Sequence, residues 1–226
     1  MIKEKKSLTH DTIMKTLDWS YDKALNGGIP GMDTAIELAE SYMKKGGSVL
    51  DNSTSLIKWQ NTKSATSGFL TGLGGIITLP VAIPANMASV LLVQVRMIAA
   101  IAHMGGYDLK DDQVKTFVFT CLAGNSAKEI LKSSGISIGR KLAISGIKKI
   151  PFKIITKINK AVGFRLLTKF GEKGIINLGK MVPIAGGILG GTLDAVSTNI
   201  IGKTAQKLFI DGSLIQENND STIIDM

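Results

Sequence analysis

The stretch that decides the fold is SATSGFLTGLGGIITLPVAIPANMASVLLVQV, residues 64–95, which contains no charged side chain. Its first part is rich in glycine, Pro80 and Pro84 interrupt its middle, and its last part is aliphatic. A stretch of this length and apolar character must be buried in protein, in lipid, or in each at different times. With the following residues to 104 it predicts an apolar helical hairpin at the centre of the molecule.

Helical periodicity continues on both sides of this hairpin. Before it, Thr9 is a plausible N-cap for a first helix, which Asn26-Gly27-Gly28 closes. β-branched residues do not alternate with polar ones anywhere, so no strand is expected. The predicted helices cover residues 8–26, 33–45, 48–62, 85–104, 108–132, 152–169 and 181–209.

These helices predict a single all-α domain of about eight helices, with two glycine-rich apolar hairpins (64–104 and 181–209) at its centre. Residues 1–63 are expected to pack on this core as amphipathic helices. The core is expected to cover residues 64–209, with basic helices at 132–180, and residues 210–226 form a polar tail. All three parts are expected to fold as one unit.

Glycine pairs four residues apart mark both hairpins. The absence of a Cβ at such positions lets another backbone approach closely, in a membrane or in tight protein packing. The pairs are Gly68/Gly72 in the first hairpin and Gly186/Gly190 and Gly187/Gly191 in the second.

The net charge of +9 comes from one region of the chain. Residues 132–180 contain 12 Lys and Arg against the single acid Glu172, whereas residues 1–63 and 64–131 are almost balanced and residues 181–226 are acidic. Such an asymmetry predicts an anionic partner, either a membrane surface or a nucleic acid.

The centre of the basic region is an amphipathic helix behind Pro151, in which lysines lie beside an isoleucine-rich face. Lysine favours diffuse attraction over bidentate base readout, so this pattern favours an anionic bilayer over nucleic acid. The alternative is a solvated lysine face on an ordinary helix. The predicted membrane-binding cations are Lys148, Lys149, Lys153, Lys157, Lys160, Arg165 and Lys169.

Two charged residues interrupt the apolar helices of the hairpins. Arg96 lies in the helix predicted over 85–104, and Asp194 lies in the helix predicted over 181–209. A guanidinium in an apolar helix must find a partner or reach the surface. We expect Arg96 and Asp194 to form an ion pair that locks the two hairpins together; the alternative is that each reaches solvent separately.

Residues 85–104 are long enough to span a membrane, about 30 Å at 1.5 Å per residue. Arg96 near the middle and the prolines before it argue against a stable span. The expectation is a helical core that docks on the cytoplasmic face of the membrane or partly inserts into it.

No motif predicts catalysis, a cofactor or a metal. His10 and His103 lack neighbouring ligands at metal spacing, and the aspartates of DLKDDQ (108–113) are better explained by helix capping than by calcium. The single cysteine, Cys121, excludes an internal disulfide, indicates a reducing compartment and is expected to be a packing residue.

Three segments together resemble the EcsC protein family. They are SGFLTGLGGIITLPVAIP (67–84), VQVRMIAAIAHMGGYD (93–108) and PIAGGILGGTLDAVSTNIIGKTAQKLF (183–209). The family often has an acidic residue near the second proline, where this chain has Ala82 and Asn86. The resemblance implies a bacterial, helical, membrane-associated protein, in a family named after a protein encoded beside an ABC transporter.

The functional expectation is a non-enzymatic protein that binds anionic membrane lipid and assists a membrane protein complex. One alternative is a membrane-associated enzyme acting on lipid or peptide, with its site around Arg96 and Asp194. The other is a nucleic-acid-binding protein. The sequence indicates neither an oligomeric state nor a particular ligand.

Overall fold

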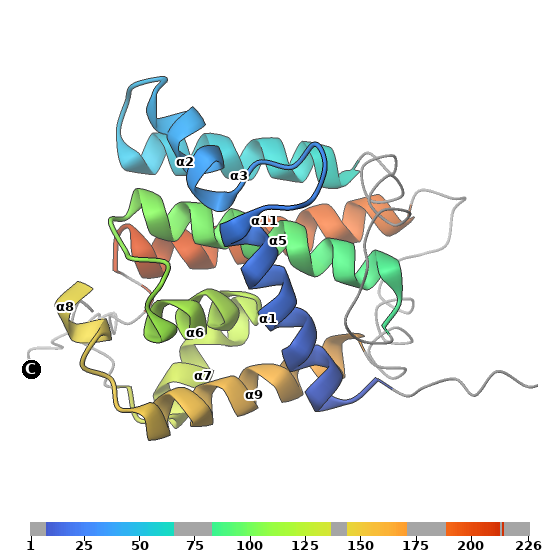
Figure 1. The fold of residues 1–226 in the computed structure, drawn as a ribbon, viewed down its shortest axis with the longest axis vertical. Coiled ribbons are helices and arrows are strands. Elements are labelled where there is room, and N and C mark those ends of the chain that lie inside the picture. The colour runs from blue at the N-terminus through green and yellow to red at the C-terminus, as the bar shows by residue number, and fades with distance from the viewer. Residues whose placement is uncertain (1–7, 66–82, 137–143, 171–188, 213, 215–226) are drawn as a thin grey trace, which may run out of the picture.

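The computed structural model describes residues 8–65, 83–136, 144–170, 189–212 and 214. Every regular element in these ranges is a helix (Figure 1), which confirms the all-α prediction. The elements are α1 (His10–Asn26), α2 (Ala35–Met43), α3 (Val49–Ala65), α5 (Ala85–Met104), α6 (Asp112–Cys121), the 3-10 turn η1 (Gly124–Ser126), α7 (Ala127–Ser133), α8 (Ile144–Ile147), α9 (Phe152–Phe170) and α11 (Leu189–Phe209).

Local chemistry fixes the ends of the first two helices. The predicted N-cap is confirmed at Thr9, whose hydroxyl accepts from the Thr12 amide while the Thr12 hydroxyl accepts from the Thr9 amide. Gly27 then ends α1 at a φ of 73°. Thr34 and Glu37 form a second capping box at the start of α2, which sequence analysis did not identify.

The prediction of one helix over 108–132 is wrong. The structure divides this segment into α6, η1 and α7, with Gly124 at a φ of +55° between the two α-helices. A left-handed residue cannot continue an α-helix, and glycine is the residue that adopts this conformation without steric cost. Periodicity alone did not reveal the break, because apolar side chains continue on both sides of it.

Helix α5 is the centre of the molecule. It packs against α1, α2, α3, α6 and α11 (Figure 1), and its side chains from Leu91 to Ala102 are all buried. The window Met87–Met104 has the length and hydropathy of a membrane span, yet 89% of it is buried inside the protein. The rest of the fold surrounds this helix.

The two ends of the molecule lie on either side of α5 (Figure 1). Helices α2 and α3 lie together at one end, whereas α9 lies at the opposite end and packs on α1, α6 and α7 (Figure 1). The described residues of the second predicted hairpin form α11, which packs on both α3 and α5.

Close packing by glycine is present, but at positions that sequence analysis did not select. A Cβ on Gly202 of α11 would lie 2.6 Å from Cγ1 of Ile57 in α3. Of the predicted close-packing glycines, Gly68, Gly72, Gly186 and Gly187 lie outside the described residues. Gly190 and Gly191 lie in the first turn of α11, and their side-chain surroundings lie outside the description too.

We expect Gly202→Ala to lower the free energy of unfolding by about 1–3 kcal/mol, because the added methyl group forces α3 and α11 apart. Urea unfolding measures this change. Ile57→Ala removes the opposing branches, so the double variant should be more stable than the sum of the two single effects. Additive effects would contradict close packing at this position.

Candidate functional site

The outer side of α9 is a continuous cationic surface. Lys153, Lys157, Lys160 and Arg165 are exposed along it, and α9 contains no acidic residue. At 100° per residue these side chains project to one half of the helix. We call this set, together with exposed Phe164, the α9 surface.

The inner side of α9 is apolar and faces the protein. Ile155, Ile158, Val162 and Leu166 are buried against the core. The isoleucine-rich face that sequence analysis identified beside the lysines therefore packs against the protein core and is not exposed to a bilayer. Among the exposed large apolar side chains, α9 contributes Phe152, which is 79% exposed, and Phe164, which is 51% exposed.

Helix α1 holds α9 in place through His10. The ring nitrogen Nε2 of His10 lies 3.2 Å from the carbonyl oxygen of Lys160, and its ring lies 4.9 Å from that of Phe164. Gly163 permits this approach, since a Cβ there would lie 2.4 Å from the His10 ring. His10 thus has a packing role.

The seven predicted membrane-binding cations fall into two groups. Three have a described partner: Lys148 pairs with Asp111 at 3.2 Å, Lys157 donates to the carbonyl oxygen of Ser133, and Lys169 donates to the Ser197 hydroxyl. The described residues place no carboxylate within 4.0 Å of the other four, which are Lys149, Lys153, Lys160 and Arg165. Lys157 and Lys169 donate to neutral oxygens, so of the seven cations only Lys148 has its charge compensated by a described carboxylate.

Arg96 extends from α5 towards α2. It is 5% exposed, and its Nη1 donates to the carbonyl oxygen of Asp33 at 3.0 Å. Burial lowers the pKa of the guanidinium, and the charge of Asp33 opposes this shift. The side chain of Asp194 lies outside the described residues, so its pairing with Arg96 stays a prediction.

A different polar contact joins α5 to α11. Gln94 Nε2 donates to the Thr198 hydroxyl at 3.3 Å in the buried interface between these helices. Gln94 precedes Arg96 by two residues, about 200° around the helix, so it faces α11 while Arg96 faces α2. Sequence analysis assigned no contact to Gln94; the available signal was the position of a polar side chain within an apolar helix.

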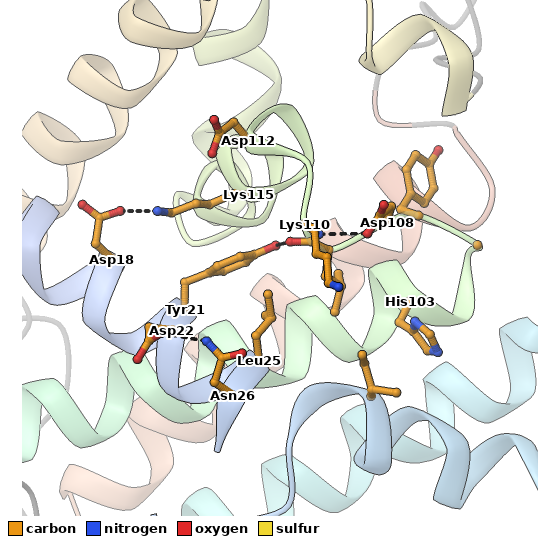
Figure 2. A pocket seen from close by; sticks show the side chains of 14 residues that line it. Asp18, Tyr21, Asp22, Leu25, Asn26, His103, Asp108, Lys110, Asp112 and Lys115 are labelled. Carbon is orange, nitrogen blue, oxygen red and sulfur yellow. Dashed lines mark hydrogen bonds and ion pairs between the residues drawn. The ribbon is translucent and has the colours of Figure 1, made fainter. Parts of the chain in front are cut away.

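A cleft of about 640 Å³ lies between α1, α6 and the loop before α6 (Figure 2). Tyr21 crosses its floor and donates to the carbonyl oxygen of Leu109 at 2.7 Å. Lys115 Nζ lies 2.6 Å from an Asp18 carboxylate oxygen and 5.7 Å from the centre of the Tyr21 ring. Sequence analysis missed this cleft because its groups come from separate helices.

The cleft is acidic overall, because four aspartates and two lysines line it. Burial raises the pKa of Tyr21, and Asp108, Asp111 and Asp112 raise it further, so its hydroxyl stays protonated at neutral pH. Lys115 is neutralised by Asp18. These contacts tie α1 to α6 and so support the helices beneath α9.

The aspartates of residues 108–113 do not cap α6 in the predicted way. Asp111 occupies the N-cap position, but its side chain accepts no amide hydrogen bond there. Its carboxylate is instead 3.2 Å from Lys148 Nζ, and Asp108 Oδ1 accepts from the Lys110 amide. The ion pair with Lys148 directs the Asp111 carboxylate away from the amides of α6, which explains why Asp111 does not cap the helix.

Within the described ranges, His, Cys, Asp and Glu side chains form no group of three or more that could hold a metal ion. His103 lines the large cleft, whereas His10 does not (Figure 2). Cys121 is fully buried, as predicted for a packing residue, and burial raises the pKa of its thiol.

The sequence model of the EcsC protein family matches residues 9–210. No curated protein and no solved structure matches the chain.

The buried thiol predicts how stability depends on alkaline pH. Cys121 stays protonated in the folded chain, whereas the unfolded thiol ionises near pH 8.5. The folded state then binds more protons, so the free energy of unfolding should fall as pH rises from 8 to 10, by up to about 1.4 kcal/mol per pH unit. Urea unfolding measures this slope. Cys121→Ala should flatten it, and parallel curves for the two proteins would contradict the assignment.

Proposed function

Because the chain belongs to the EcsC protein family over residues 9–210, we propose that it is a helical protein of the membrane surface that binds anionic lipid through the α9 surface. The observation that carries this proposal is the helix itself. It is 19 residues long, contains no acid, and presents four cations on its exposed side.

Charge supplies most of the attraction in this proposal. Each Lys or Arg near an anionic bilayer contributes about 1 kcal/mol, and salt screens that contribution within a Debye length of about 10 Å at 0.1 M. Lys153 and Arg165 are twelve residues apart, which is about 18 Å along the helix axis. A surface of this length can contact several headgroups at once.

Aromatic side chains supply a smaller apolar contribution. Phe164 is 51% exposed and lies between the lysines, and Phe152 is 79% exposed at the start of the helix. Aromatic rings favour the headgroup region of a bilayer. Since the aliphatic face of α9 packs on the core, we propose reversible binding at the cytoplasmic face of the membrane, without insertion of α9.

A membrane protein complex is the second partner in this proposal, in keeping with the family resemblance. Lipid binding through α9 leaves the α2–α3 end directed away from the bilayer (Figure 1). That end would then be accessible to a partner from the cytoplasm.

Flotation with vesicles tests the lipid proposal. Wild-type protein should float with vesicles that contain phosphatidylglycerol and remain behind with pure phosphatidylcholine. Lys153→Gln/Lys160→Gln/Arg165→Gln should weaken binding roughly 100-fold, since three charges are lost at about 1 kcal/mol each. Raising the salt concentration should release the wild-type protein.

The matched control removes three charges elsewhere. Lys58, Lys203 and Lys207 are exposed on α3 and α11, and their change to Gln should leave flotation close to wild type. Equal losses in both triple variants would contradict a specific role for the α9 surface. Absence of flotation together with salt-sensitive binding to duplex DNA would assign the surface to nucleic acid instead.

A further inference from the structure

A second polar cavity, of about 360 Å³, lies between α2, α3 and α5, at the end of the molecule opposite α9. Its lining combines cations, aromatic rings and an amide from α2, α3, α5 and the segments on either side of α2. The residues that matter here are Asp33, Tyr42, Lys45, Trp59, Gln60 and Arg96. This cavity plays no part in the proposed lipid binding.

Arg96 is buried in the wall of this cavity with unmet hydrogen-bonding capacity. It is 5% exposed, and one described acceptor, the carbonyl oxygen of Asp33, lies within hydrogen-bond distance. Its Nε has no acceptor among the described residues. The charge of Asp33 stabilises the guanidinium in part. A buried guanidinium whose N–H groups lack acceptors is costly, so an anion in the cavity would stabilise it further.

Lys45 brings a second cation to the same cavity. Its Nζ lies 4.2 Å from the centre of the Tyr42 ring, which holds the ammonium group near the cavity wall. Asp33 is the acidic residue of the lining, and its side chain is exposed. The cavity therefore has an excess of positive charge.

The remaining lining suits an organic group attached to the anion. The Gln60 side chain is 1% exposed, and its Oε1 has no donor among the described residues. The rings of Tyr42 and Trp59 form apolar walls beside it. A cavity of 360 Å³ lies within the range that small-molecule sites occupy.

We propose that this cavity binds a soluble phosphorylated small molecule, with its phosphate between Arg96 and Lys45 and its organic part against Tyr42, Trp59 and Gln60. One guanidinium satisfies both oxygens of a carboxylate, whereas two cations, one on α5 and one in the turn after α2, match a tetrahedral group with several charged oxygens. The cavity lies at the α2–α3 end, opposite the α9 surface, so we assign the phosphate to a molecule in solution.

Tryptophan fluorescence reports binding directly, because Trp59 lines the cavity. Titration of the full chain with inorganic phosphate, and with glycerol 3-phosphate, should produce a saturable change in emission that sodium chloride at equal ionic strength does not produce. Trp59→Phe should remove the change and leave the emission of Trp19. An equal response to chloride, or a response that survives Trp59→Phe, would overturn the proposal.

Two neighbouring lysines provide a matched pair of variants. Lys45→Gln should raise the half-saturating concentration of glycerol 3-phosphate roughly tenfold, the usual effect of losing one charged hydrogen bond. Lys44→Gln should have no effect, because Lys44 pairs with Glu40 and does not line the cavity. Equal effects of the two changes would overturn the site.

Arg96→Gln should abolish the response and Arg96→Lys should weaken it, with circular dichroism reporting whether each variant folds. If Arg96→Gln does not fold, the Lys45 and Lys44 variants decide the question. Vesicles containing phosphatidylglycerol identify the source of the phosphate. An unchanged Trp59 emission on their addition supports a soluble ligand, and a change that glycerol 3-phosphate reverses would overturn that assignment in favour of a lipid headgroup.

Discussion

The enclosure of α5 is the constraint on which the rest of the structure depends. Arg96 is the only Lys, Arg, Asp or Glu among its twenty residues, and the side chains from Leu91 to Ala102 are all buried. Burial of an aliphatic side chain stabilises a fold by about 1.5–3 kcal/mol, so exposing this helix to water would cost more than a domain's whole stability. Helices α1, α2, α3, α6 and α11 satisfy the constraint by surrounding it. The α9 helix lies one layer further out, and its outer side is therefore free to be cationic.

The helices that enclose α5 also bury Arg96. As a result, the cations at the two ends of the molecule differ in their exposure. The guanidinium is directed to the α2–α3 end, where a cavity and Lys45 lie beside it. The α9 end has exposed cations instead, supported from beneath by the Tyr21 and Lys115 contacts between α1 and α6. Our two proposals thus assign anions of different kinds to opposite ends: a lipid surface at α9 and a small phosphorylated molecule at Arg96.

Strong local signals made much of the fold predictable from the sequence. The Thr9 cap and the helix at 85–104 are local features, and the structure agrees with both. The break at Gly124 depends on one backbone angle that apolar periodicity does not encode.

Contacts between distant segments were not predictable from the sequence. The acceptor for Arg96 is the backbone carbonyl oxygen of Asp33, 63 residues away, and the glycine that packs against Ile57 is Gly202. The basic residues of α9 were identified, but its inward isoleucine face required the packed structure.

The central claim is that α5 is buried in protein rather than in lipid, and our proposal accordingly assigns contact with the membrane to α9. Hydrogen exchange measured along the chain, without lipid and then with phosphatidylglycerol vesicles, tests it most directly. We predict that the amides of α5 exchange most slowly of all in the lipid-free protein, at rates that vesicles do not change. Fast exchange of α5 in water, with protection only after vesicles are added, would show that α5 is buried by the bilayer and would contradict the account.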